Sequence, residues 1–141
     1  MQSIYQDQLL AFARHAREQI PIPLSKLTHV AEVNNPICGD RIRANINIEK
    51  NVIVSAHAEA KGCALCEAGA GLWLNTVVGL TMSSMQSHHV ALKSWLEGQE
   101  DQNIYVLFSD TLHSFASVRA IKNRHKCITL AFSTADRFKP I

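Results

Sequence analysis

The sequence lacks long apolar runs, a strong charge of either sign and internal repeats, and each absence excludes a class of protein. No run among its 141 residues is long and apolar enough to span a membrane, so we expect no membrane partner. The net charge of +2 is too small to indicate nucleic acid as a partner. No repeat, low-complexity tract or linker divides the chain, which predicts a single domain over residues 1–141.

The apolar core of a signal peptide is missing as well. The stretch "MQSIYQDQLLAFARHAREQI" mixes charges through an amphipathic pattern, and we therefore expect a cytoplasmic protein. Aromatic residues are also missing from the basic run "VRAIKNRHK". A nucleic-acid patch usually interleaves the two, so a solvated or partner-docking face is the better interpretation of this run.

Two segments alternate apolar and polar residues with a period of two. In "RIRANINIE" and "NVIVSAHAE" every second residue is isoleucine, valine or alanine. This period predicts two half-buried strands, and "EKN" between them fits a tight hairpin in which Asn51 tolerates a positive φ. One face of such a sheet is polar, and the other needs a cover.

Helical patterns precede and follow this hairpin. We expect a helix at about residues 3–19, a short extended piece at 25–33, a long helix over "CALCEAGAGLWLNTVVGLTMSSM", a second capped by Ser87, and a last one at 122–138. Gly69 and Gly71 in the long helix permit the close approach of a neighbouring backbone. Strands followed by helices predict the α+β class.

The four cysteines are the main chemical signal. Cys38, Cys63, Cys66 and Cys127 stand in a chain expected in a reducing compartment, where metal or redox work is commoner than disulfides. The alternative is that they are small, buried, apolar residues scattered through the core.

A hairpin brings its two ends together, and this predicts a cluster. Cys38 and Asp40 precede the hairpin and Cys63 follows it, 25 residues after Cys38. Gly39 lets Cys38 and Asp40 point the same way, whereas Cys127 must arrive from the far end of the chain. Three cysteines and one aspartate are a complete tetrahedral ligand set for zinc. Spacing alone favours a metal or cluster site over scattered structural cysteines.

The pair Cys63 and Cys66 in "CALC" offers a competing interpretation as a redox CxxC motif. The preceding strands form a hairpin and not a βαβ unit. No proline lies between Pro36 and Pro140, so none can face the pair in the cis form. Cys66 is better explained as a buried or auxiliary thiol on the first turn of the helix.

Three motifs in order resemble the IscU/NifU-like iron–sulfur cluster assembly scaffolds. They are "NPICGD", then "GCALCEAGAG" after the hairpin, then "RHKC" near the end. The 64 residues from Cys63 to Cys127 and the R-x-x-C form at Arg124 resemble the SufU-type branch. The family's A-S-x-S after the second cysteine reads Ala-Gly-Ala-Gly here, and Lys126 stands where ordinary scaffolds have a histidine.

The resemblance implies a small antiparallel sheet of about three strands, covered on one face by helices. It implies a site of Cys38, Asp40, Cys63 and Cys127 that holds iron, a [2Fe–2S] cluster or zinc. In scaffold members this site receives sulfur from a cysteine desulfurase and passes the cluster to acceptor or scaffold proteins. In SufU-type members it holds zinc, the residue matching Cys38 accepts a persulfide, and the arginine matching Arg124 lies beside the site.

These implications lead to three functional hypotheses. The first is an iron–sulfur scaffold or sulfur acceptor, which is not a conventional enzyme. The second is a zinc-dependent sulfurtransferase that accepts persulfide from a cysteine desulfurase. The third, less favoured, is a structural zinc domain that only binds a partner.

Overall fold

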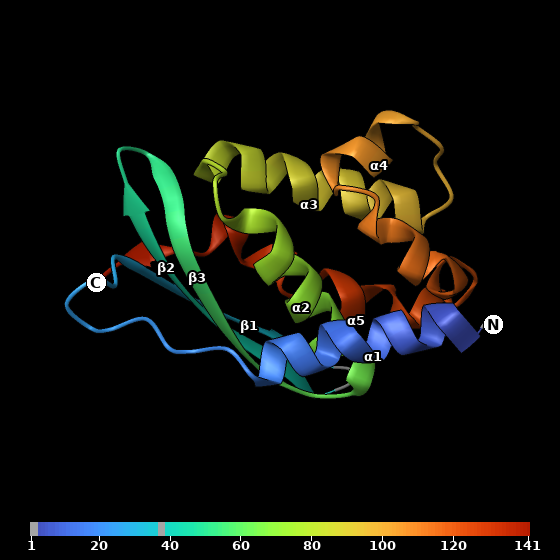
Figure 1. Cartoon of the computed structure of the whole chain (residues 1–141), viewed down its shortest axis with the longest axis horizontal. Helices are drawn as coiled ribbons and strands as arrows, with labels where there is room; N and C mark the ends of the chain where they lie inside the picture. Colours follow the sequence, from blue (N-terminus) through green and yellow to red (C-terminus); the bar gives the residue numbers. More distant parts are fainter. Residues whose placement is uncertain (1–2, 37–38) are drawn as a thin grey trace.

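One antiparallel sheet with helices on one face makes up the computed structural model, which describes residues 3–36 and 39–141 (Figure 1). The strands are β1 (His29–Asn35), β2 (Asp40–Glu49), β3 (Val52–Lys61) and β4 (Lys139–Pro140), in the order β3-β2-β1-β4. The sequence predicted about three strands. The fourth, β4, is only two residues long and pairs with the start of β1. Two residues are too few to show the alternation of apolar and polar residues by which a strand is recognised in the sequence.

The predicted hairpin is confirmed. Strands β2 and β3 pair from Arg41 opposite Lys61 to Glu49 opposite Val52, with one irregularity near Asn47. Lys50 and Asn51 turn the chain with φ of 52° and 67°, the left-handed pair that a tight hairpin needs. Because Ile42, Ala44 and Ile46 are completely buried, their face of the sheet is the one that the helices cover.

The long helix predicted after Gly62 is wrong in length. The chain forms α2 (Ala64–Val77) and then α3 (Met82–Leu96), following α1 (Ser3–Arg17) at the N-terminus. Gly79 separates them with a φ of 95°, and its N–H donates to the carbonyl of Ile53 in β3. Thr81, and not the expected Ser87, caps α3 by accepting a hydrogen bond from the Ser84 N–H. The break is therefore fixed by contacts with a distant strand.

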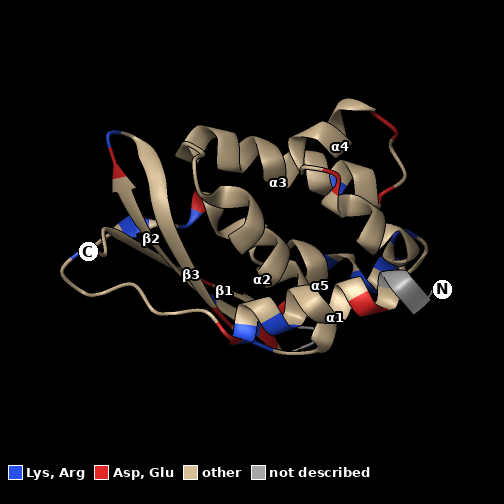
Figure 2. Ribbon diagram, in the orientation of Figure 1, with Lys and Arg blue, Asp and Glu red and all other residues tan. Residues whose placement is uncertain are grey.

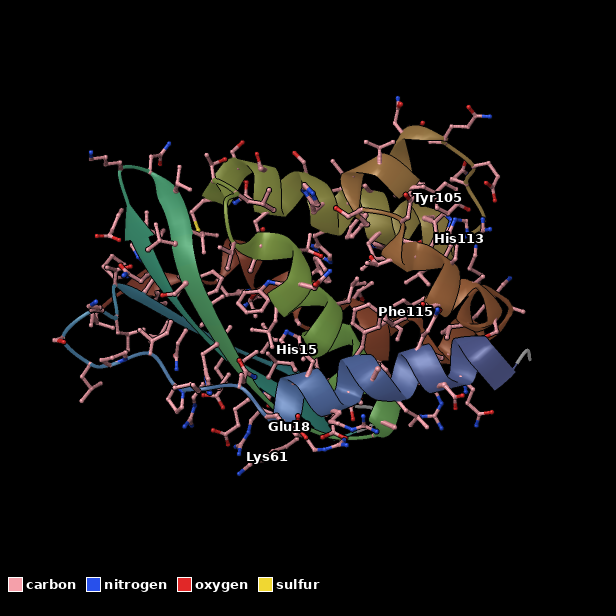
Figure 3. All side chains as sticks on the ribbon, viewed as in Figure 1. His15, Glu18, Lys61, Tyr105, His113 and Phe115 are labelled. Carbon is pink, nitrogen blue, oxygen red and sulfur yellow. The ribbon has the colours of Figure 1, made fainter. Side chains whose placement is uncertain are left out.

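The C-terminal third consists of short helical pieces. They are α4 (Asn103–Leu107), the 3-10 helix η1 (Thr111–Ala120), η2 (Lys122–Arg124), α5 (His125–Thr129) and η3 (Phe132–Asp136). The continuous helix predicted for residues 122–138 is thus wrong. The rings of Tyr105 and His113 stack with centroids 4.6 Å apart, and so link α4 to η1 (Figure 3).

Helix α2 lies at the centre of the helical layer. It packs against α1, β3 and α5, and Figure 1 shows it between α1 and α3. The largest fully buried side chains are Trp73, Trp95, Phe108, Phe115 and Phe132. None of the helices in the described part of the chain is long and apolar enough to cross a membrane.

Candidate metal centre

Three of the four predicted ligands converge at one end of the hairpin. Asp40 is the first residue of β2, Cys63 immediately precedes α2, and Cys127 lies inside α5. One ligand atom from each of these side chains lies within 4.8 Å of the other two. Zn–S bonds of about 2.3 Å in a tetrahedron hold their sulfurs about 3.8 Å apart, so a small closure brings the three atoms to bonding positions.

Cys38, the fourth predicted ligand, lies outside the described residues. The described residues on either side of it are close to the cluster. Asn35, at the end of β1, is the cross-strand partner of Asp40. Gly39 has a φ of 74°, which favours glycine, and its N–H donates to the Asn35 carbonyl over 2.8 Å. Asn35 and Gly39, which flank residues 36–38 in the sequence, therefore both lie beside Asp40.

Asp40 is a buried carboxylate with one satisfied oxygen. Its side chain is held by the start of α2, because the Cys63 N–H donates to Oδ1 over 3.3 Å. A Cβ on Gly62 would lie 2.1 Å from the same oxygen, so only glycine leaves room for the carboxylate here. The other oxygen, Oδ2, is buried and has no hydrogen-bond partner among the described residues. A buried anionic oxygen left in this way points to a cation as its partner.

Cys127 is fully buried in the metal-free protein and is a thiol there. Burial raises its pKa to about 12; hydrogen bonds with Asp40 and Cys63 and the charge of Cys63 add to the rise, and a hydrogen bond from Arg124 lowers it. Arg124 thus lies beside the cluster, where the sequence predicted a site-adjacent cation. Because metals bind thiolate, a bound cation must displace this proton.

Gly69 allows the helix that carries Cys127 to pack closely against α2. Gly69 of α2 faces the carbonyl of Ile128, and a Cβ there would lie 2.4 Å from that oxygen. Gly71 faces the carbonyl of Phe12 in α1 in the same way, at 1.9 Å. The predicted close approach of a neighbouring backbone at both glycines is confirmed. What the sequence did not reveal is that Gly62 and Gly69 each make room for one predicted ligand, Asp40 and Cys127 respectively.

Cys66 stands apart from this cluster. It lies in the first turn of α2 and is fully buried in the apolar core. Burial raises the pKa of its thiol to about 12, and the charges of Asp40, Cys63 and Glu67 add to the rise. A redox CxxC motif needs a reactive thiolate, so the structure agrees with the interpretation of Cys66 as a buried thiol.

The donor set fits a soft or borderline cation. Two sulfurs and one carboxylate oxygen are ligands that zinc and iron–sulfur chemistry prefer, and no described residue competes for Asp40 Oδ2. The donors come from the start of β2, the residue before α2, and α5, so only the folded chain assembles them. The fold and this cluster together define a small α+β protein with a candidate metal-binding centre at one end of its sheet.

Comparison with known proteins identifies the family. The family model "NifU-like N terminal domain" matches residues 4–127, and the chain belongs to this family. The zinc-dependent sulfurtransferase SufU of Bacillus subtilis (strain 168) is 25% identical over 108 residues, which cover 77% of this chain and 72% of that protein. The iron–sulfur cluster assembly scaffold protein IscU of Thermotoga maritima is 29% identical over 115 residues, 79% of this chain and 76% of that protein. The resemblance predicted from the three motifs is confirmed.

Solved structures share the fold. An iron–sulfur cluster assembly scaffold protein of the SUF system from Fervidobacterium islandicum superposes with a TM-score of 0.79 at 21% identity, over 95% of both chains. The N-terminal part of a NifU-like protein from Brucella abortus superposes with a TM-score of 0.67 at 23% identity, over 95% of this chain and 91% of that one. The predicted α+β fold, with helices on one face of an antiparallel sheet, is confirmed.

Proposed function

We propose that this chain is an iron–sulfur cluster assembly protein that accepts sulfur and holds a metal or a cluster through Cys38, Asp40, Cys63 and Cys127. The observation that carries the proposal is the meeting of Asp40, Cys63 and Cys127 ligand atoms within 4.8 Å, with Asp40 Oδ2 buried and unpartnered among the described residues. Membership of the family and relatives named as SufU and IscU support it.

In this proposal Cys38 is the sulfur acceptor. Its thiolate attacks the outer sulfur of a persulfide on a cysteine desulfurase. A new S–S bond forms on Cys38, the donor's S–S bond breaks, and the donor cysteine leaves as a thiolate, so no external oxidant or reductant is needed. Arg124, which hydrogen-bonds Cys127, offsets negative charge at the site. A bound cation supplies the positive charge that keeps the ligating thiols ionised.

Two relatives favour two versions of this role. The Bacillus subtilis relative is named a zinc-dependent sulfurtransferase, and the Thermotoga maritima relative is named a scaffold. As a transfer protein, this chain would keep zinc as a resident ion and pass sulfur on from Cys38. As a scaffold it would carry the [2Fe–2S] cluster as cargo for acceptor proteins. The transfer version makes it an enzyme, and the scaffold version does not.

Metal and sulfide content separates the versions. We expect the protein purified in air to hold one zinc if it is a transfer protein. Anaerobic loading with iron and sulfide should produce a coloured, oxygen-sensitive chromophore if it is a scaffold. Protein that takes up neither zinc nor a cluster contradicts both versions.

A Cys38→Ala variant tests the role of the acceptor. We expect it to remain folded and to lose the stimulation of a cysteine desulfurase that the wild-type chain gives. A structural zinc domain would behave differently, since loss of a ligand from such a domain lowers stability together with partner binding. The measurements are desulfurase turnover and the melting temperature of the same preparations.

A further inference from the structure

A cavity of about 680 Å³ lies between α1 and the turn that leads into η1, and we call it the α1–η1 cavity. One wall is a face of α1 with the i, i+3, i+4 and i+7 spacing of a helical stripe, formed by Gln8, Ala11, Phe12 and His15. The start of η1 forms the opposite wall, and Asn75 of α2 contributes to the lining. None of the described lining residues belongs to the candidate metal centre, and the volume suits a small organic molecule.

Contacts within and behind the lining fix two of its polar side chains. The ring of His113 stacks almost parallel on that of Tyr105, with centroids 4.6 Å apart and an angle of 5° between the planes. The Tyr105 hydroxyl in turn accepts a hydrogen bond from Trp95 Nε1 over 3.1 Å. Gln8 Oε1 accepts a hydrogen bond from the Ser114 hydroxyl, which joins the two walls. Side chains held in this way lose little further conformational entropy when a ligand binds.

The turn before η1 holds Asp110 in a conformation that few residues adopt. Ser109 and Asp110 have φ of 52° and 60°, in the left-handed region that aspartate and asparagine tolerate better than most residues do. The Asp110 N–H donates to the Tyr105 carbonyl over 2.7 Å. The Ser109 N–H donates to the Val106 carbonyl over 3.1 Å, so both bonds tie the turn to α4. Figure 2 shows an acidic position in this turn. The backbone therefore fixes where the Asp110 carboxylate meets the cavity.

Three exposed lining side chains have polar groups available to a ligand. Asp110, Asn75 and His15 make no side-chain hydrogen bond or ion pair with any other residue in the described part of the chain. They belong to three different segments, and Figure 3 shows His15 on α1 and His113 on η1. A molecule in the cavity therefore meets a carboxylate, an amide and an imidazole that have no partner among the described residues.

The charge of the lining selects the class of ligand. With histidine neutral, Asp110 is the one charged residue among the described lining residues, and no lysine or arginine is among them. An anion would meet a carboxylate with no cation beside it. A metal ion does not fit either. Within residues 3–36 and 39–141, three ligating atoms of histidine, cysteine or acidic side chains come within 4.8 Å of one another only at Asp40, Cys63 and Cys127.

Helix α1 supplies apolar surface to the cavity. Phe12 is half-buried, and its ring packs against that of Phe115 with centroids 5.4 Å apart. Ala11 is exposed beside it on the same wall. An aromatic or aliphatic group can cover these two side chains of α1 while a charged end reaches Asp110.

We propose that the α1–η1 cavity binds a small organic amine. The ammonium group donates to the Asp110 carboxylate, and the apolar or aromatic body of the ligand lies against Ala11 and Phe12. The Asn75 amide and the His15 ring bond to a hydroxyl or carbonyl where the ligand carries one. A charge-assisted hydrogen bond combined with apolar contact gives both affinity and discrimination by charge. The inference goes beyond the proposed function, because the cavity and the candidate metal centre share no described residue.

Three probes of similar size and different charge test the class of ligand. They are phenethylamine, which is cationic, phenethyl alcohol, which is neutral, and hydrocinnamate, which is anionic. Calorimetric titration of the full chain at neutral pH should show saturable binding of phenethylamine with a Kd of about 1 mM or lower. We expect the alcohol to bind at least about tenfold more weakly, and hydrocinnamate not to bind.

An Asp110→Asn variant tests the carboxylate. Asparagine tolerates the left-handed φ, so the substitution keeps the turn and removes the charge. We expect the Kd for phenethylamine to rise by about tenfold or more, and the Kd for phenethyl alcohol to stay unchanged. The matched control is Glu49→Gln, which removes an exposed charge at the end of β2 and should change neither Kd.

An Ala11→Leu variant fills the cavity from an exposed helical position and should abolish the binding of both the amine and the alcohol. The melting temperature of each variant is measured alongside and should match the wild type, so that the loss lies in binding. The proposal is overturned if phenethylamine does not bind the folded wild type, or if hydrocinnamate binds as tightly as the amine. It is also overturned if Asp110→Asn or Ala11→Leu keeps the wild-type affinity for phenethylamine, or if Glu49→Gln loses as much affinity as Asp110→Asn.

Discussion

At the scale of single residues, Asp40 shows how a folded chain can hold a group that is unfavourable without its ligand. Its side chain is 3% exposed, and its Oδ2 has no partner in the described part of the chain. Burying an anionic oxygen without a partner costs free energy. Gly62 and the Cys63 N–H nevertheless keep the carboxylate in place. We interpret this arrangement as stability given up for metal binding.

Replacement of Asp40 by asparagine tests this interpretation. Asp40→Asn keeps the size of the side chain and the acceptor for the Cys63 N–H, and it removes the charge. We expect the metal-free variant to melt at the same temperature as the wild type or higher, because the substitution removes a buried charge of which one oxygen, Oδ2, has no partner among the described residues. Zinc affinity should fall by at least about tenfold, because a ligand oxygen is lost. Thermal melts of metal-free protein and a chelator competition measure the two effects.

The opposite result would contradict the interpretation. If metal-free Asp40→Asn melts well below the wild type, the carboxylate serves the fold and not a cation. The matched control is Asp7→Asn, which removes an exposed charge from α1, an element that carries none of the three clustered residues, and it should leave both measurements unchanged.

Sequence reasoning succeeded at this scale where chain connectivity was sufficient. Asp40 and Cys63 lie at the two ends of one hairpin, so the period-two pattern alone brought them together. Cys127 was different, because no local pattern says where a distant short helix docks. The position of Cys127 depends on the close contact between Gly69 and the Ile128 carbonyl, which joins α2 to α5. The assignment of all four residues as ligands stays a prediction, since Cys38 lies outside the described residues.

At the scale of elements, two glycines of α2 allow two neighbours to approach closely. Gly69 meets the carbonyl of Ile128 beside Cys127, and Gly71 meets the carbonyl of Phe12 in α1. Contacts of this kind between a glycine Cα–H and a carbonyl recur where helices pack closely. Only the first of the two contacts lies beside a predicted ligand, Cys127, so the Gly71 contact serves as a control for the Gly69 contact.

We expect Gly69→Ala and Gly71→Ala to lower the free energy of unfolding by similar amounts, about 1–3 kcal/mol, because each forces a backbone apart. The better helix propensity of alanine offsets part of this cost in both. Gly69→Ala alone should also lower zinc affinity by at least about tenfold, because it displaces the helix that holds Cys127. Urea unfolding and chelator competition distinguish the effects. Equal zinc affinity in the two variants would show that the close contact at Gly69 does not position Cys127.

Two helices that the sequence pattern predicted were wrong in the structure, and both errors have a physical cause. The residues from Cys63 to Met85 read as one helix because no proline interrupts them. The structure ends α2 at Val77 because the Gly79 N–H and the Leu80 carbonyl bond to Ile53 of β3. The C-terminal helix failed for a related reason, since its short pieces pack against α2 and α3 and have little periodicity of their own. Local propensity cannot reveal contacts with distant strands and helices.

At the scale of the whole molecule, two half-buried histidines contribute to how the fold responds to acid. His57 on β3 has a buried Nδ1 without a partner among the described residues. Burial lowers its pKa below 6.5, and the charge of Glu59 opposes the shift. Burial likewise lowers the pKa of His89, with Asp136 opposing and Lys93 adding to the shift. Both groups resist protonation only while the chain is folded.

The sign of the pH dependence follows from this difference. Well above pH 6.5 both histidines are neutral whether the chain is folded or unfolded, and they add no pH dependence; the dependence begins as the pH approaches 6.5, where the unfolded chain starts to bind their protons. Below pH 6.5 the unfolded chain binds their protons first, so the free energy of unfolding falls as the pH drops towards the folded pKa values. We expect His57→Gln to be less sensitive to acid than the wild type, and His57→Gln/His89→Gln to be less sensitive still. Urea unfolding of metal-free protein from about pH 8 to about pH 5 measures this. Curves that stay parallel for all three proteins would mean that the two histidines take up protons equally well in the folded and unfolded chains, and acid sensitivity would then have to arise elsewhere in the fold.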